Sequence, residues 1–297
     1  MPVSNGLRLA IGGVVIHVSA VNGRTISIPE ERAHIFRFSS EKEPDLTISV
    51  VTSGPSRAAE LPVKREVFSN NISWSIYELE GGAIALSDAS SAGERSDRLI
   101  ILDIAAGIAS IYYNLPEDAP NGAIVDPLSY PVEQLLMMNI LARNIGLVVH
   151  SCGVSYRGAG LLFVGSSTAG KTTMANLWGE NEETKILSDD RIIVRSADNA
   201  YRIYGTPWHG TGRFAKPDSA VLKRVFFLKK GFGNSLRVLA PAEAVSRMIA
   251  ASFPPFWSKT GMEFTLSLCS GIFENIVPYE LTFKPEGSAV DLIKESL

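Results

Sequence analysis

The sequence predicts an α/β protein in which a P-loop domain, built for binding phosphates, follows a smaller β-rich N-terminal domain. Three observations support this. An apolar run at 161–164 leads into a glycine-rich loop that closes with Gly-Lys-Thr. Short β-rich segments separated by turn residues occupy the first 126 residues, and helical and strand patterns mix in the remainder. We therefore expect domains at residues 1–126 and 127–297.

Composition places the chain among ordinary globular proteins. Of its 297 residues, 45% are hydrophobic and 20% are charged. The net charge of −3 gives no reason to expect nucleic acid or a membrane as partner. We find no signal-type leader or apolar run of spanning length. Cys152 and Cys269 have no metal-ligand or disulfide-rich spacing, so we expect buried thiols in a cytoplasmic protein.

The N-terminal half predicts a small antiparallel β domain. Glycine, proline, asparagine and serine punctuate it, as turns require, and helical periodicity is nearly absent. The segment at 116–127, rich in proline, predicts the connector to the second domain. The expected strands are Val14–Val18, Leu46–Val51, Ser73–Leu79, Ala83–Leu86, Leu99–Leu102 and Ala109–Tyr113.

The C-terminal half begins with a strongly apolar helix at 131–143, which we expect to be buried. A strand at 147–156 then turns back into the phosphate-loop strand. The remaining expected elements are a helix at 173–178, strands at 185–187, 225–228 and 236–239, helices from Pro241 and at 263–275, and a strand at 279–283.

The glycine-rich loop carries the clearest chemical signal. It matches the pattern G-x-x-x-x-G-K-T, in which backbone N–H groups and a helix N-terminus surround phosphate oxygens. Lys171 is expected to reach the β- and γ-phosphates, and Thr172 to hold Mg²⁺. The predicted nucleotide-binding residues are Gly165, Ser166, Ser167, Thr168, Ala169, Gly170, Lys171, Thr172 and Thr173.

An aspartate pair follows the next strand. Asp189 and Asp190 stand at a strand end, and strand ends at one sheet edge converge on the ligand crevice. One carboxylate, assigned to Asp189, is expected to hold Mg²⁺ with Thr172. The other, Asp190, is expected to act as the base for an attacking hydroxyl, although the two roles can be exchanged. A turn or helix cap is the alternative explanation of the pair.

Two further segments are candidates for acceptor binding. His150 belongs to a strand expected to pair with the phosphate-loop strand, where it can bind the acceptor or relay a proton; an ordinary structural histidine is equally consistent. The glycine-rich segment 205–213 offers Trp208, His209 and Arg213 as substrate contacts. An ordinary connection with a packed indole is the alternative.

The order of these motifs resembles the catalytic domain of the HPr kinase/phosphorylase family. The corresponding segments here are 150–154, 165–172 and 188–190, and the match extends from about Leu128 to the C-terminus. The chain has Thr172-Thr173 where that family usually has serine and then an acidic or small residue. Its segment 205–210 replaces the family's Glu-x-Arg-Gly signature. The loop is also similar to that of phosphoenolpyruvate carboxykinase.

The resemblance implies a diverged kinase that uses ATP and Mg²⁺ to phosphorylate a serine, free or in a peptide or protein, and that forms an oligomer. In that reading Lys171, Asp190 and His150 are the catalytic residues. Two other functions fit a phosphate loop alone. One is a nucleoside triphosphatase switch, and the other is a nucleotide-dependent module that binds a partner without transfer.

Overall fold

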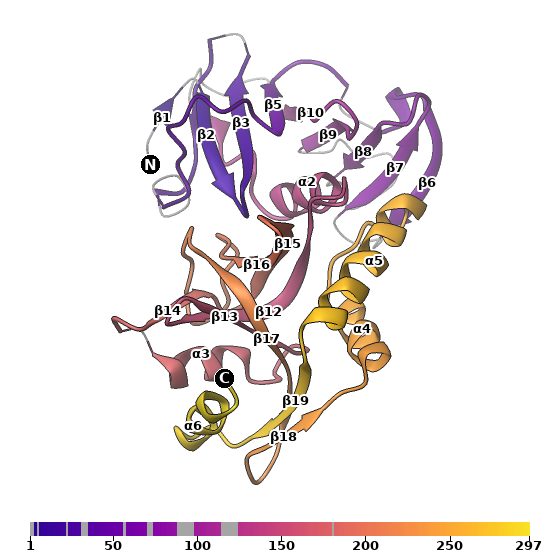
Figure 1. Ribbon diagram of the computed structural model, residues 1–297. Helices are drawn as coiled ribbons and strands as arrows, with labels where there is room; N and C mark the ends of the chain where they lie inside the picture. Colours follow the sequence, from indigo (N-terminus) through magenta and orange to yellow (C-terminus); the bar gives the residue numbers. More distant parts are fainter. Residues whose placement is uncertain are drawn as a thin grey trace. The chain divides into compact units, whose positions relative to one another are not determined.

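The computed structural model describes residues 3–4, 6–21, 23–30, 35–55, 58–69, 74–87, 98–113, 124–179 and 181–297. Over these residues the fold is mixed α/β, as the sequence predicts (Figure 1). No helix in this part of the chain is both long and apolar enough to span a membrane.

The chain divides into two compact units. The first comprises Met1–Ala10 and Val14–Ile140, and the second comprises Ile11–Gly13 and Leu141–Leu297. The division thus falls at residue 140 rather than at the expected 126. Helix α2 (Val132–Leu141), which we expected in the second domain, belongs almost wholly to the first unit. Residues 116–123 of the expected connector lie outside the described residues.

The first unit is β-rich, as predicted, but it is not purely antiparallel. Strand β5 pairs in parallel with both β3 and β10. The larger sheet has the order β2-β3-β5-β10-β9-β8-β7-β6. Its strands are β2 (Gly6–Ile11), β3 (Val14–Ala20), β5 (Leu46–Val51), β6 (Val63–Ser69), β7 (Ser75–Leu79), β8 (Ile84–Ser87), β9 (Arg98–Asp103) and β10 (Ile108–Tyr113).

A smaller sheet and a short helical turn complete this unit. The sheet has the order β1-β4-β11. Its strands are β1 (Val3–Ser4), β4 (Ile26–Ser27) and β11 (Ile124–Val125), and the 3₁₀ turn η1 covers Ala58–Glu60.

The sheet of the second unit closes on itself. Strands β12, β13, β17, β16 and β15 pair successively, and β15 pairs back with β12. Strand β19 pairs in parallel with β17 and carries β18 at its far edge, while β14 pairs with β12. The bounds are β12 (Gly146–Tyr156), β13 (Ala159–Val164), β14 (Thr184–Ser188), β15 (Arg191–Ala197), β16 (Ala200–Tyr204), β17 (Ser219–Lys230), β18 (Ser235–Val238) and β19 (Pro278–Phe283).

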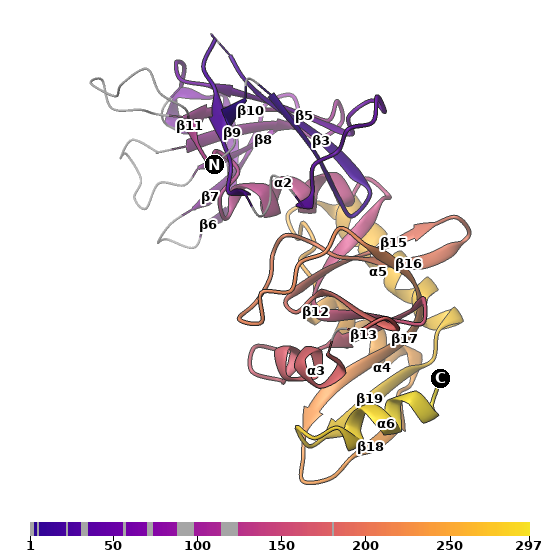
Figure 2. The same ribbon diagram turned by 90° about the vertical axis from the view of Figure 1, so that its left-hand side faces the viewer.

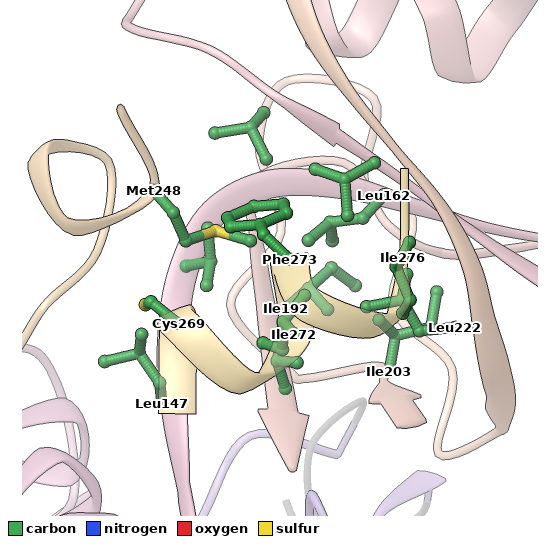
Figure 3. Packing of buried hydrophobic residues seen from close by; sticks show 14 of the residues in the cluster. Leu147, Leu162, Ile192, Ile203, Leu222, Met248, Cys269, Ile272, Phe273 and Ile276 are labelled. Atoms are coloured by element: carbon green, nitrogen blue, oxygen red, sulfur yellow. The ribbon is translucent and has the colours of Figure 1, made fainter. Parts of the chain in front are cut away.

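Helices cover this sheet on both faces. Side chains of α3 (Lys171–Trp178) and α6 (Ser288–Glu295) belong to one apolar cluster, and those of α4 (Pro241–Ala250) and α5 (Lys259–Asn275) belong to another. Figure 1 shows α3 and α6 on one side of β17 and β19 and α4 and α5 on the other, and in Figure 2 the first pair lies in front of the second. The α4–α5 cluster includes Met248, Phe273 and Ile276, packed against strand residues (Figure 3).

Strand β13 explains why the phosphate loop follows an unbroken apolar run. Leu161 and Phe163 face the α3–α6 cluster, whereas Leu162 and Val164 face the α4–α5 cluster. A strand covered on both faces must be apolar at every position. The loop therefore leaves a rigid strand fixed from both sides.

We predict that Phe226→Ala lowers the free energy of unfolding by about 3–5 kcal/mol, because it removes a fully buried ring. Phe226 stacks on Phe163 and Tyr279, with ring centroids 5.3 and 5.8 Å away. Urea denaturation followed by tryptophan fluorescence measures the change. The control Leu266→Ala, at a side chain 52% exposed, should cost about 0.5 kcal/mol or less. Equal losses for the two variants would contradict the packing described here.

Candidate active site

The glycine-rich loop at 165–170, which we call the phosphate loop for its sequence pattern alone, joins the end of β13 to the start of α3. Its backbone turns sharply, with positive φ at Thr168 (68°) and Gly170 (106°). A Cβ at position 170 would also lie 2.7 Å from the Phe283 ring, so only glycine fits there. Residues 166–168 are exposed. The loop thus offers its backbone to solvent next to the N-terminus of α3, an arrangement suited to an anion.

Lys171, the first residue of α3, lies against this loop. Its ammonium Nζ donates to the carbonyl oxygens of Gly165 and Ser166, at 3.0 and 2.9 Å. Burial lowers the pKa of Lys171, while the charges of Asp190 and Asp189 act in the opposite direction. The cation is therefore positioned by the loop itself.

Asp189 lies in the bend between β14 and β15 and is 1% exposed. Its Oδ2 accepts hydrogen bonds from Thr172 Oγ1 and from the backbone N–H of Gly212, both at 2.9 Å. Its Oδ1 accepts from the N–H of Gly210 at 2.8 Å. A buried carboxylate requires such donors, because desolvation without them is very costly. Asp189 thereby links the loop's helix to segment 205–213.

The two glycines of that segment are required by this contact. A Cβ at Gly210 or at Gly212 would lie 2.8 Å from Asp189 Oδ2. Any side chain there would push the backbone N–H groups away from the carboxylate. The glycine-rich composition of segment 205–213 thus serves a close approach to Asp189.

Asp190 points away from Asp189 and meets a different set of groups. Its Oδ1 lies 3.0 Å from His150 Nε2, and because a carboxylate only accepts, this nitrogen carries the proton. Its Oδ2 accepts from the guanidinium of Arg191. Burial raises the pKa of Asp190, but the hydrogen bond from His150 and the charges of Arg191 and Lys171 outweigh it. The net pKa is lowered, so Asp190 is ionised at neutral pH.

The pairing of β12 with β13 places His150 at the site. Ser151 is opposite Val164, the last residue before the phosphate loop, so His150 lies level with the loop's start. On the other side of β12, His150 is opposite Arg191. The strand pairing expected from the sequence is therefore confirmed.

Arg191 and Phe253 also belong to this site, although sequence reasoning missed both. The Arg191 guanidinium lies 5.1 Å from the centroid of the Phe253 ring, and that ring lies 6.3 Å from the His150 ring. Segment 251–253 runs beside β12, where the N–H of His150 donates to Ala251 O at 2.7 Å. Adjacency to the aspartate pair was an available signal for Arg191. For Phe253 there was none, because the contact spans a hundred residues of sequence.

Segment 205–213 lies at the site, but not through the side chains expected. Trp208 is buried, at 8% exposure, which agrees with the alternative of a packed indole rather than with a substrate contact. His209 and Arg213 are exposed, and the hydrogen bonds to Asp189 come from the backbone N–H groups of Gly210 and Gly212, which lie between them. Thr206 connects the segment to β15, because its hydroxyl donates a hydrogen bond to Arg191 O at 2.7 Å. Its packing agrees with a structural role for the indole.

The oxygen donors at the loop suit Mg²⁺ bound together with a nucleotide. The Thr172 hydroxyl and the Asp189 carboxylate are hard ligands, and Mg²⁺ is usually held by one or two protein oxygens plus phosphates and water. In the part of the chain that the structure describes, no group of three or more His, Cys, Asp or Glu residues could hold a metal. Cys152 and Cys269 are buried and free, as expected, and burial raises the pKa of each thiol.

Comparison of the chain with models of protein families and with curated proteins finds no match.

We predict that His150→Phe raises the pKa of Asp190, because it removes the hydrogen bond that favours the carboxylate. A titration of the carboxyl carbon by ¹³C NMR, assigned with Asp190→Asn, measures the shift. A lowered folded pKa stabilises the protein above the unfolded pKa, and this contribution is lost as pH falls through the folded pKa. The variant should therefore lose stability chiefly at neutral pH and less in acid. An unchanged Asp190 titration would contradict the interaction.

Proposed function

We propose that this chain is an ATP-dependent kinase of the P-loop type, with a catalytic domain like that of HPr kinase. It would transfer the γ-phosphoryl group of ATP, with Mg²⁺, to a hydroxyl, which by the resemblance is that of a serine, free or in a peptide or protein. The observation that carries the proposal is the 2.9 Å hydrogen bond from Thr172 to Asp189, with the His150–Asp190 pair one residue further on. The residues that could bind phosphate, bind a metal ion and act as the base therefore lie close together in the structure, although they come from separate segments.

Lys171 and the loop amides are assigned to the phosphates. The ammonium of Lys171 would exchange the carbonyls of Gly165 and Ser166 for phosphate oxygens, which offer stronger, charge-assisted hydrogen bonds. Thr172 and Asp189 would hold Mg²⁺, which when bound neutralises charge developing on the β- and γ-phosphates. Asp189 suits this role better than that of base, because Thr172 and two backbone amides already engage it.

Asp190 is assigned as the base. The acceptor oxygen would bond to the γ-phosphorus as the bond from phosphorus to the bridging oxygen breaks, which releases ADP. The hydroxyl proton would pass to the Asp190 carboxylate. Its lowered pKa makes it a weak base, but a loose phosphoryl-transfer transition state needs little prior deprotonation of the nucleophile.

His150 and Arg191 are assigned to positioning. Nε2–H of His150 and the guanidinium of Arg191 hold the two oxygens of Asp190, which fixes the direction of its free lone pairs. The assignment of serine as acceptor rests on the resemblance alone. His209 and Arg213 remain candidates for acceptor contacts from the exposed side of segment 205–213.

A nucleotide-dependent switch is a second candidate, favoured by one observation. Asp189 joins the loop's helix directly to segment 205–213, so a change at Thr172 can be transmitted to that segment. Incubation with γ-labelled ATP, Mg²⁺ and serine-containing acceptors separates the two. A kinase labels an acceptor found by mass spectrometry, whereas a switch releases phosphate without one, and a binding module does neither.

We predict that Lys171→Ala abolishes ATP binding or turnover, because the loop loses the cation that meets the phosphates. Isothermal titration calorimetry with Mg·ATP measures this. The matched control is Lys223→Ala, at an exposed lysine of β17, which should bind as the wild type does. Full ATP affinity in Lys171→Ala would refute the assignment of the loop.

We predict that Asp190→Asn lowers the transfer rate by about 10²–10⁴-fold, the usual contribution of a general base. ATP affinity should stay close to that of the wild type, since Asp189 and Thr172 remain in place. The control is Asp198→Asn, at an exposed aspartate of the β15–β16 turn. Transfer at the wild-type rate in Asp190→Asn would show that another group acts as base.

A further inference from the structure

One feature of the second unit has no role in the site described so far. Phe232, in the turn between β17 and β18, is 100% exposed. Gly231 and Gly233 flank it, and a Cβ at Gly233 would meet nothing within 4 Å. Exposed apolar side chains are common, but a large aromatic ring fully in solvent on a turn is suited to stacking on a ligand.

This turn lies next to the phosphate loop. The N–H of Gly231 donates to Phe283 O at 3.2 Å, and the Phe283 ring packs against Gly170 of the loop. Phe283 therefore contacts both segments, the phosphate loop through its ring and the turn through its backbone carbonyl. Figure 1 shows the β17–β18 connection extending beyond the ends of β17 and β19.

The turn also lies on the side of the loop opposite the proposed chemistry. Strand β13 pairs with β12 on one side and with β17 on the other. The His150–Asp190 pair lies on the β12 side. A triphosphate whose γ end lies at Thr172 and Asp189 would therefore point its nucleoside end toward β17 and β19. At this position the ring of Phe232 is available to a base.

The positive charge of Lys230, at the end of β17, is consistent with a nucleotide whose base points toward β17 and β19. Lys230 is exposed and, by strand alternation, lies on the same face as Leu228, which packs with the α3–α6 cluster. Among ion pairs between described residues, Lys229 joins Glu280 at 3.8 Å, whereas Lys230 takes part in none. Lys230 thus leaves a positive charge beside the path from phosphate to base.

We infer that the β17–β18 turn is the nucleobase site, where the ring of Phe232 stacks on the base of the bound nucleoside triphosphate. The inference rests on the proposed function, since it needs a nucleotide on the loop. Stacking is tolerant of base identity because every base has a π-face. Asn234, the amide side chain of the turn, donates to Ser288 Oγ and accepts from Lys284 N, so both its ends are engaged. ATP and GTP should therefore bind with similar affinity.

The test is calorimetry of the full chain with Mg²⁺ and three probes, namely ATP, GTP and inorganic tripolyphosphate. Phe232→Ala should weaken the binding of ATP and of GTP by roughly 5- to 150-fold, as the loss of one base-stacking contact does. The affinity of Phe232→Ala for tripolyphosphate should equal that of the wild type. Phe232→Trp, which keeps an aromatic ring, should bind ATP and GTP as the wild type does. The control Phe256→Ala removes another exposed ring, 52% exposed, and should bind all three probes as the wild type does.

Each other result decides against the inference. Unchanged ATP and GTP affinity in Phe232→Ala overturns the base site while leaving the kinase proposal intact. An equal loss for tripolyphosphate overturns it too, because the ring would then act on the loop rather than on a base. If the wild type binds tripolyphosphate but no nucleotide more tightly, no base site exists. If it binds no probe, both proposals fail.

Discussion

The buried carboxylate of Asp189 is the constraint on which the site depends. At 1% exposure it has lost its hydration, and the hydroxyl of Thr172 and two backbone N–H groups replace the lost water. Removing any of these donors would leave a buried charge short of partners, at a cost of about 1–3 kcal/mol or more. The phosphate loop and segment 205–213 are consequently fixed relative to each other, and glycine is required at 210 and 212.

Sheet topology brings the rest of the site to this carboxylate. The β12–β13 pairing sets His150 level with the start of the loop, and β15 begins immediately after the aspartate pair. The two aspartates therefore face different partners although they are adjacent. Asp189 meets the loop's helix, and Asp190 meets His150 and Arg191. This difference in hydrogen-bond partners follows from the bend between β14 and β15, not from the spacing of the two residues in the sequence.

Local signals allowed much of this to be predicted. The apolar run of β13, the β12 strand and the helix starting at Pro241 were expected close to their observed bounds, because burial on both faces and N-terminal proline leave clear patterns. Strands β15 and β16 and helix α6 were not expected. For β16 and α6 the elements are short and flanked by polar residues, whereas β15 does carry a strand signal in its β-branched run Ile192-Ile193-Val194. Parallel pairing within the first unit and the boundary at residue 140 depend on contacts between distant segments.

The central claim is that Thr172 and Asp189 form a metal-binding pair at a phosphate loop. Calorimetric titration of ATP into the wild type and Thr172→Val, with Mg²⁺ and again with EDTA, tests it most directly. Valine keeps the shape of threonine but lacks the hydroxyl that donates to Asp189. The account predicts that Mg²⁺ strengthens ATP binding in the wild type and that the variant loses this gain. In EDTA, where no Mg²⁺ is available, the two proteins should bind ATP with equal affinity. The same gain from Mg²⁺ in both proteins would contradict it.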